Sequence, residues 1–361
     1  MALPPHGANP RALYESMNLE RPNEIIDFSE NTNPLGPPEA LRKSWDGWFS
    51  SIFSYPDPEG LRLRKEIALF HHVSRHQVLL GNGTAELMMA AARLFQGKKV
   101  GIIHPAFSEY ERVLKANDCG IHHFYTQEEN GWEPDDEELM SFLAQGHALF
   151  VCNPVNPTGL PYSRASLEKW ICQAETAGGM ILLDEAFIDM VGEERSMSGW
   201  TGNRGLLIFR SMTKMFSIAG LRLGYLLGSK ERVEQMKRWL PHWNVNALAL
   251  EAGELCISDR KFQEETRQFI HTERTRLFSF YKELGFKTSA SQANYYLLQP
   301  PDPSDTSELF EYLLKKGLVL RHTENYRGIE GRFLRAGIKT KKQNDRLMQA
   351  VKEWQRNAFL L

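Results

Sequence analysis

The fold is decided by residues 210–225, which read RSMTKMFSIAGLRLGY. Residues 205–210, GLLIFR, form an apolar run bounded by glycine and predict a buried strand. This strand would deliver Lys214 to the end of a sheet, where α/β sheets place their ligands. Arg222 follows between two glycines, which let the backbone pass close to a bound group. A lone lysine of this kind is more often a surface residue on a loop, so other motifs must show whether Lys214 has a functional role.

Length and composition describe an ordinary globular protein. The 361 residues exceed the size at which one core usually suffices, so we expect two domains. The hydrophobic share of 42% and the charged share of 24% are typical of soluble proteins. The formal net charge of −2 gives no reason to expect a nucleic acid or an anionic membrane as partner. An anionic ligand therefore requires a local cluster of cations.

The start of the chain and its cysteines favour a cytoplasmic location. The first residues lack the basic region and apolar core of a signal peptide, and no apolar run approaches the roughly 20 residues that span a bilayer. The four cysteines show neither CxxC spacing nor ligand-like spacing to histidine, so we expect reduced thiols and no metal site. They are Cys119, Cys152, Cys172 and Cys256.

A glycine turn precedes an apolar helical pattern within residues 78–88, VLLGNGTAELM. The glycines expose backbone N–H groups, Thr84 adds a hydroxyl, and a helix N-terminus favours an anion. The pattern therefore predicts a phosphate-binding turn that includes Gly83 and Thr84. A tight turn without a ligand is the alternative, because Gly-x-Gly alone is a weak signal.

Two further predicted strands end in polar residues. Residues 148–152, ALFVC, run into NPVNPTG at residues 153–159, a firmly set turn that contains Asn156. Residues 180–183, MILL, run into Asp184, for which a helix cap is the alternative role. Because helical patterns separate the strands, we expect a mostly parallel sheet with right-handed crossovers.

Together these motifs resemble the fold-type I pyridoxal-phosphate enzymes of the class I/II aminotransferase superfamily. The resemblance rests on Ser-x-(Ser/Thr)-Lys…Gly-x-Arg-x-Gly-Tyr at residues 211–225 and on Asn-Pro-x-Asn-Pro-Thr-Gly at residues 153–159, and it covers nearly the whole chain. It implies an α/β fold, with a mostly parallel seven-stranded sheet flanked by helices in a large domain and a small α+β domain. The implied parts are an N-terminal segment and active-site loop (1–45) that packs with the small domain, the large domain (46–240) and the small domain (241–361).

The resemblance also implies pyridoxal 5′-phosphate as cofactor and a homodimer. Lys214 is then the catalytic residue and joins the cofactor covalently through its amine. Asp184 keeps the pyridine nitrogen protonated, and Asn156 donates to the phenolic oxygen. Phe107 stacks on the ring. The implied phosphate-binding residues are Gly83, Thr84, Ser211, Arg222 and, reaching across from the partner chain, Tyr55. A tyrosine packed in a turn is the alternative for the last of these.

Within the superfamily, the chain is similar to two groups that bind phosphorylated substrates. These are the threonine-phosphate decarboxylases of cobalamin biosynthesis and the histidinol-phosphate aminotransferases. The His-Gly-x-Asn start at residues 6–9, DFSENTNPLG at residues 27–36, WNVNALA at residues 243–249 and the Asn-Tyr pair at residues 325–326 look like the decarboxylases. We therefore expect an enzyme that acts on a phosphorylated amino acid.

The decarboxylase resemblance implies conversion of L-threonine O-3-phosphate to (R)-1-amino-2-propanol O-2-phosphate and carbon dioxide. Arg335, helped by Asn156, would bind the α-carboxylate, and Arg321 with His6 would bind the phosphate, because arginine binds both anions through paired hydrogen bonds. The implied substrate-binding residues are His6, Gly36, Asn156, Arg321 and Arg335. Amino transfer from histidinol phosphate to 2-oxoglutarate is the first alternative, and a non-catalytic pyridoxal-phosphate-binding protein or regulator is the second. For His6, a tail without a role is the alternative.

Overall fold

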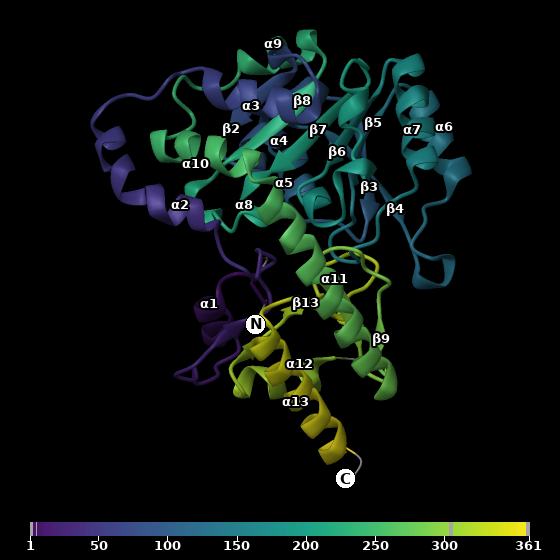
Figure 1. Ribbon diagram of the computed structural model, residues 1–361. Helices are drawn as coiled ribbons and strands as arrows, with labels where there is room; N and C mark the ends of the chain where they lie inside the picture. Colours follow the sequence, from purple (N-terminus) through teal and green to yellow (C-terminus); the bar gives the residue numbers. More distant parts are fainter. Residues whose placement is uncertain (1–2, 5, 303–305, 359–361) are drawn as a thin grey trace.

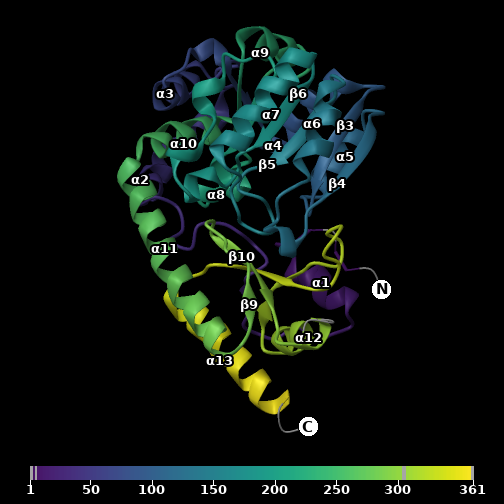
Figure 2. The same cartoon turned by 90° about the vertical axis from the view of Figure 1, so that its right-hand side faces the viewer.

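The structure is a computed structural model that describes residues 3–4, 6–302 and 306–358 (Figure 1). An upper part is built on a large sheet, and a lower part holds a smaller sheet and the C-terminal helix (Figure 1). Figure 2, turned by 90°, shows the same two parts one above the other.

Seven strands form the large sheet in the order β2-β8-β7-β6-β5-β3-β4. Strand β8 runs antiparallel to both neighbours, and the other neighbouring strands pair in parallel. The predicted mostly parallel seven-stranded sheet is therefore confirmed. The strands are β2 (Val78–Gly81), β3 (Lys99–His104), β4 (Gly120–Tyr125), β5 (Ala148–Cys152), β6 (Met180–Asp184), β7 (Leu206–Ser211) and β8 (Gly224–Gly228).

Helices cover both faces of this sheet, and its central strands are therefore apolar along their length. Alternate side chains of β5 and β6 enter two different cores. Phe150 and Leu182 pack in the core that includes α4 and α5, and Leu149 and Ile181 pack in the core that includes α6 and α7. The α-helices of this part are α2 (Glu39–Ser44), α3 (Leu61–His71), α4 (Thr84–Ala92), α5 (Glu109–Lys115), α6 (Asp136–Ala144), α7 (Arg164–Ala177), α8 (Met212–Met215), α9 (Lys230–Lys237) and α10 (Ala247–Ser258).

Helix α11 (Arg260–Glu283) connects the two parts. In both views it begins beside the large sheet and runs down the flank of the smaller one (Figures 1 and 2). The side chain of Asp259 caps its N-terminus by accepting from the backbone N–H of Phe262 at 3.0 Å. Helix α10, which precedes it, still packs against α3 of the upper part.

The lower part combines a four-stranded antiparallel sheet, in the order β12-β13-β10-β9, with helices of its own. The N-terminal segment joins it, because β1 (Ile26–Asp27) pairs in parallel with β11 (Leu318–Val319). The Tyr14 hydroxyl on α1 also donates to the Leu314 carbonyl at 2.7 Å. The domain limits expected from the sequence stay a prediction. The other elements are α1 (Pro10–Ser16), β9 (Lys287–Thr288), β10 (Tyr295–Gln299), α12 (Ser307–Lys315), β12 (Arg321–His322), β13 (Leu334–Gly337) and α13 (Lys341–Ala358).

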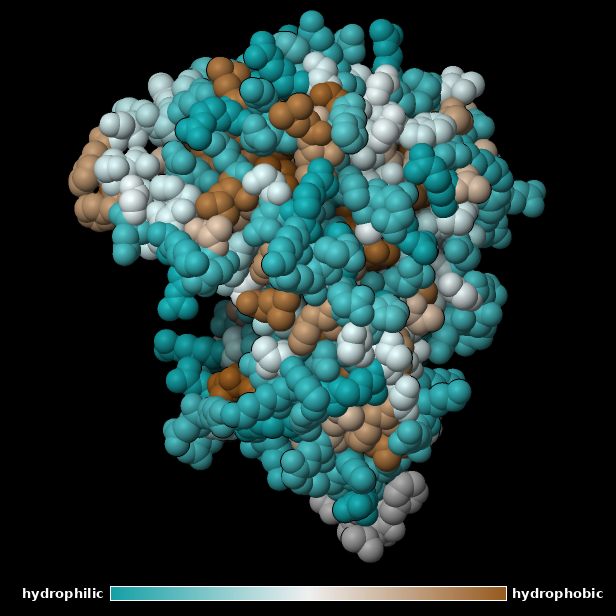
Figure 3. Space-filling model, viewed as in Figure 1, coloured by the Kyte–Doolittle hydropathy of each residue, from teal (hydrophilic) through white to brown (hydrophobic). Residues whose placement is uncertain are grey.

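One surface of the upper part exposes large apolar side chains. It follows α2 and covers the 3₁₀ helix η1 (Trp45–Phe53) and its C-terminal flank. Phe49, Phe53 and Tyr55 are 65%, 73% and 83% exposed. Hydrophobic side chains are visible at the left margin of the space-filling view, where this segment lies (Figure 3). Among the described residues, every helix is too short or too polar to cross a bilayer.

Candidate active site

A cavity of about 270 Å³ opens between the carboxyl ends of the large-sheet strands and the small antiparallel sheet. This is the edge at which open α/β sheets bind ligands. Of the residues predicted for the site, those that line the cavity are His6, Gly83, Thr84, Phe107, Asn156, Asp184, Ser211, Lys214, Arg222, Arg321 and Arg335. The structure therefore brings together residues that lie more than 300 positions apart in the sequence.

Lys214 occupies the short helix α8, which follows β7 directly. Its amine lies 5.6 Å from the centre of the Phe187 ring, and the backbone N–H of Asn33 donates to the Lys214 carbonyl at 3.0 Å. Burial lowers the pKa of the lysine amine, and the positive charge of Arg335 lowers it further. A lower pKa increases the neutral fraction of the amine, which is the form that attacks an aldehyde.

Asp184 ends strand β6, and its carboxylate is buried. The Tyr110 hydroxyl donates to Oδ2 at 2.5 Å, and the backbone N–H of Ala186 donates to Oδ1 at 3.0 Å. Burial raises the pKa of Asp184, whereas these two hydrogen bonds lower it. Tyr110 is itself held by stacking on Phe150, with ring centres 4.8 Å apart. The carboxylate is therefore fixed in position at the base of the cavity.

The predicted phosphate-binding turn is closely packed against Arg222. Gly83 has a φ of +78°, and a Cβ atom at this position would lie 2.6 Å from Nη2 of Arg222. A Cβ on Gly224 would lie 2.8 Å from the backbone nitrogen of Thr84. The Ser211 hydroxyl lines the same cavity. Glycines thus allow backbone N–H groups, hydroxyls and a guanidinium to converge, which suits a phosphate group.

Arg335 lies on β13 and is only 6% exposed. Its Nη1 donates to Oδ1 of Asn156 at 2.6 Å and to the Tyr326 hydroxyl at 3.2 Å, and its Nη2 donates to the Ser29 carbonyl at 2.7 Å. These acceptors are neutral oxygens that fix the plane of the guanidinium. The bond from Arg335 also orients the Asn156 side chain. Its Oδ1 faces the arginine, so its Nδ2 group is left to donate to a ligand.

Arg321 lies on β12 and is the cross-strand partner of Arg335. It donates to the side chain of Asn325 and to the carbonyl of Pro4, the latter at 3.1 Å. Its guanidinium carbon lies 5.7 Å from the centre of the Tyr326 ring. Burial lowers its pKa from the usual arginine value.

His6 reaches the cavity from the N-terminal segment. Its ring centre lies 5.9 Å from that of Phe107, which is predicted to stack on the cofactor. The segment is anchored close by, because the backbone N–H of Ala8 donates to the Ser29 hydroxyl at 2.9 Å. In the structure, His6 therefore belongs to the cavity wall.

Two predicted residues lie outside the cavity of this chain. Gly36, with a φ of +77°, forms a turn in which its N–H donates to the Asn33 carbonyl at 3.2 Å. Tyr55 is 83% exposed, and its ring lies 5.0 Å from that of Trp243. The substrate contact of Gly36 and the role of Tyr55 in a partner chain stay predictions.

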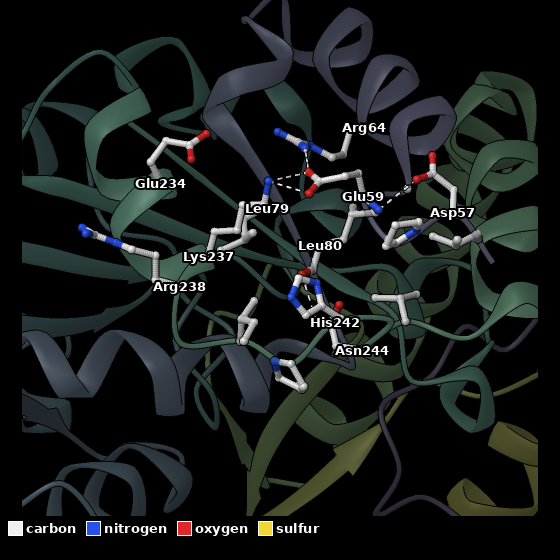
Figure 4. Close-up of a pocket in the computed structure, with 16 residues that line it drawn as sticks. Asp57, Glu59, Arg64, Leu79, Leu80, Glu234, Lys237, Arg238, His242 and Asn244 are labelled. Carbon is white, nitrogen blue, oxygen red and sulfur yellow. Dashed lines mark hydrogen bonds and ion pairs between the residues drawn. The ribbon is translucent and has the colours of Figure 1, made fainter. Parts of the chain in front are cut away.

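A larger cavity of about 360 Å³ lies elsewhere on the upper part, beside α3, α9 and β2 (Figure 4). Figure 4 shows Lys237 and Arg64 directed at the same carboxylate, that of Glu59, at 2.6 and 2.9 Å. None of the described residues predicted for the site lines it. In this cavity Lys237 and Arg64 are already paired with Glu59. We therefore place the active site in the cavity of about 270 Å³, which most of the predicted residues line.

Sequence reasoning missed several residues that shape the site. Tyr110 was not singled out because its partner Asp184 is 74 positions away, and no local pattern marks such a pair. Ser29 contributes a backbone carbonyl, which any residue could supply. The sequence places Tyr326 in a resemblance motif but gives no signal that its hydroxyl contacts Arg335. Among the described residues no group of three or more histidine, cysteine or acidic side chains is arranged to hold a metal ion.

The chain matches the family described as Aminotransferase class I and II over residues 23–351, and it belongs to this family. It is 32% identical to the threonine-phosphate decarboxylase of Salmonella typhimurium over 96% of this chain and 95% of that protein. It is 29% identical to the histidinol-phosphate aminotransferase of Moorella thermoacetica over 91% of this chain and 85% of that protein.

Solved structures show the same fold. The histidinol-phosphate aminotransferase of Clostridium acetobutylicum superposes with a TM-score of 0.86 at 29% identity, over 92% of this chain and 100% of that chain. The histidinol-phosphate aminotransferase of Sinorhizobium meliloti, solved in complex with pyridoxal 5′-phosphate, gives 0.85 at 18% identity, over 97% and 95%. The predicted family, fold and cofactor are confirmed: the chain is a pyridoxal-phosphate-dependent enzyme. The buried Asp184 carboxylate and the glycine-lined turn at Gly83 fit this cofactor.

Proposed function

We propose that the enzyme decarboxylates L-threonine O-3-phosphate to (R)-1-amino-2-propanol O-2-phosphate and carbon dioxide. The observation that carries this proposal is the pair of buried arginines, Arg321 and Arg335, on adjacent strands at one cavity. The substrate carries a carboxylate and a phosphate, so it requires two cationic sites near the reacting carbon. Arginine suits both anions because its planar fork forms paired hydrogen bonds.

Each arginine has a distinct role in this proposal. Arg335 binds the α-carboxylate, because it lies beside Asn156 and influences the Lys214 amine. Arg321 binds the substrate phosphate together with His6, since both line the side of the cavity that the N-terminal segment closes. Gly36 is proposed to approach the substrate when the loop that carries it closes.

The other residues bind the cofactor and move the proton. Gly83, Thr84, Ser211 and Arg222 are proposed to hold its phosphate, and Phe107, Asp184 and Asn156 its ring. Bound pyridoxal phosphate would supply the electron sink for the pair that the α-carbon retains as carbon dioxide leaves. The Lys214 amine then supplies the proton that replaces the lost carboxylate.

We also propose a cytoplasmic homodimer with shared active sites. The exposed aromatic residues of η1 and Tyr55 support this assembly, because large exposed apolar surfaces mark interaction sites. Tyr55 would reach the cofactor phosphate of the partner chain.

The four cysteines are free thiols, which fits a reducing compartment such as the cytoplasm.

Histidinol-phosphate amino transfer is the second candidate, supported by relatives with that activity at 29% identity. Both reactions use a phosphorylated substrate, so a direct comparison is required. Purified enzyme is assayed with O-phospho-L-threonine alone and with histidinol phosphate plus 2-oxoglutarate. We expect a higher kcat/KM for O-phospho-L-threonine without any 2-oxo acid. A higher kcat/KM for histidinol phosphate would replace this proposal with the aminotransferase.

A further inference from the structure

The loop between β12 and β13 carries two residues that contact the site arginines. Asn325 accepts from Arg321, and the Tyr326 hydroxyl accepts from Arg335 at 3.2 Å. The next residue, Arg327, points away from the cavity to helix α5 of the upper part. Its Nε and Nη2 lie 3.2 and 3.0 Å from the two carboxylate oxygens of Glu111.

This ion pair has the geometry of a fork that binds both oxygens of one carboxylate. Paired bonds of this kind are directional and stronger than single contacts. The Glu111 side chain is 19% exposed and that of Arg327 is 47% exposed. Glu111 also pairs with Lys115 at 2.7 Å, but that contact lies within α5. Of these two ion pairs of Glu111, the one with Arg327 crosses from a helix of the large sheet to the loop of the small sheet.

Both partners of the ion pair are adjacent in sequence to residues of the active site. Glu111 directly follows Tyr110, which donates to Asp184. Arg327 directly follows Tyr326, which contacts Arg335. The ion pair therefore connects the half of the site predicted to hold the cofactor to the half predicted to hold the substrate anions.

We infer that the Glu111–Arg327 pair is an interdomain latch, and that Arg327 is a positioning residue for anion binding. By holding the loop against α5, the latch places Asn325 and Tyr326 where they orient Arg321 and Arg335. The identity of the anion rests on the proposed function, but the mechanical link does not.

Other contacts give the loop its shape. Tyr326, Ile329 and Phe333 pack with Trp132, which precedes α6 and gives the loop a second, apolar contact with the upper part. Within the loop, the Thr323 hydroxyl donates to the Phe333 carbonyl at 2.7 Å. These contacts keep the loop folded when the latch is removed. The latch sets how firmly the folded loop is held against α5. Because the pair is partly exposed, its loss should change binding by a few-fold and leave the fold intact.

The test compares Arg327→Gln with Lys115→Gln in the pyridoxal-phosphate-loaded enzyme. Both variants remove one cation from Glu111, but only the first removes an ion pair that joins the two parts. We expect Arg327→Gln to raise the KM for O-phospho-L-threonine about two- to fivefold with little change in kcat or in cofactor absorbance. Lys115→Gln should match the wild type. Glu111→Gln combined with Arg327→Gln should be no worse than Arg327→Gln alone, because one interaction is lost in each case.

Hydrogen exchange provides a readout that needs no substrate. In ligand-free holoenzyme, peptides that cover residues 323–333 should exchange faster in Arg327→Gln and at the wild-type rate in Lys115→Gln. Equal exchange and equal KM in the two variants would overturn the latch. If the wild type turns over neither O-phospho-L-threonine nor histidinol phosphate, the proposed function fails, while the exchange comparison still decides the latch.

Discussion

Arg321 and Arg335 face each other as cross-strand partners on antiparallel strands, so two guanidinium groups lie side by side at one wall of the cavity. Like charges in this position repel each other. Among the described residues, the acceptors of Arg335 are neutral oxygens, and no carboxylate offsets this repulsion. Both groups are buried. Such an arrangement is favourable when a ligand with two negative groups completes it.

The first prediction tests whether Arg321 and His6 bind the substrate phosphate while Arg335 binds the carboxylate. Arg321→Ala and His6→Ala should lower kcat/KM for O-phospho-L-threonine and leave the much slower reaction of L-threonine almost unchanged. For Arg321→Ala we expect a loss of at least about 30-fold, which corresponds to ~2 kcal/mol for a buried charged contact.

Arg346→Ala, on helix α13 and paired with Glu24, is the control for a lost surface arginine and should behave as wild type. If the preference for the phosphorylated substrate survives both Arg321→Ala and His6→Ala, the substrate phosphate binds elsewhere.

The second prediction concerns Tyr110, which sequence reasoning did not single out. Tyr110→Phe removes the hydroxyl that donates to Asp184 at 2.5 Å, so the pKa of this carboxyl should rise above the level that burial already gives it. A carboxyl that is protonated more often stabilises a charged pyridine nitrogen less well. We expect kcat to fall about 10- to 150-fold, which corresponds to the ~1.5–3 kcal/mol of a hydrogen bond to an ion. An unchanged kcat and an unchanged cofactor spectrum would contradict this role.

The third prediction compares Gly83, at the phosphate-binding turn, with a glycine of similar φ that does not line the cavity. Gly83 and Gly97 have nearly the same φ, +78° and +72°, but a Cβ on Gly97 meets nothing within 4 Å. Gly83→Ala should weaken cofactor binding at least tenfold, because its methyl group would displace Arg222 and because the backbone at φ +78° and ψ 165° is unfavourable for alanine. Gly97→Ala should lower the free energy of unfolding by about 1 kcal/mol, because alanine disfavours a positive φ, and it should leave cofactor affinity unchanged. Equal cofactor affinity in the two variants, measured by equilibrium dialysis, would show that the turn does not hold the phosphate.

The fourth prediction concerns Glu185, which follows Asp184 but points into a separate buried network. Burial raises its pKa to about 7, although Arg210 at 3.3 Å opposes the shift. A carboxyl whose pKa is higher in the folded state stabilises the protein at low pH, and this contribution is lost as the pH rises towards about 7. Between pH 5 and 7 the wild type should therefore lose up to ~1.4 kcal/mol per pH unit from this group.

Glu185→Gln cannot titrate; its one amide oxygen can still accept from the Met197 N–H, and its Nε2 group can donate to the Ser196 hydroxyl. Its free energy of unfolding, measured with denaturant at pH 5, 6 and 7, should fall less than that of wild type. Glu168→Gln, a half-exposed control on α7, should follow the wild type. Parallel pH dependence in wild type and Glu185→Gln would show that Glu185 is ionised throughout this range.

The large sheet and the main site motifs could be predicted from the sequence because their signals are local. Apolar runs ending in Asp184, in the turn at Asn156 and before Lys214 each place a functional residue at a strand end. Contacts between distant segments have no such signal. The bond between Asn156 and Arg335 joins positions 179 apart, and the latch joins positions 216 apart. The role of Tyr55 requires a second chain, which the fold of one chain does not describe.

The most direct test of the central claim follows the carboxylate and the proton together. O-Phospho-L-threonine labelled with ¹³C in the carboxyl group is incubated with the enzyme in D₂O, without any 2-oxo acid. We expect one labelled carbon dioxide for each aminopropanol phosphate, which should carry one deuterium at the carbon that lost the carboxylate. Lys214→Ala, which lacks the amine that supplies this proton, should give neither product. Retention of the ¹³C label in a 2-oxo acid, or product formation only when 2-oxoglutarate is added, would contradict the proposed decarboxylation.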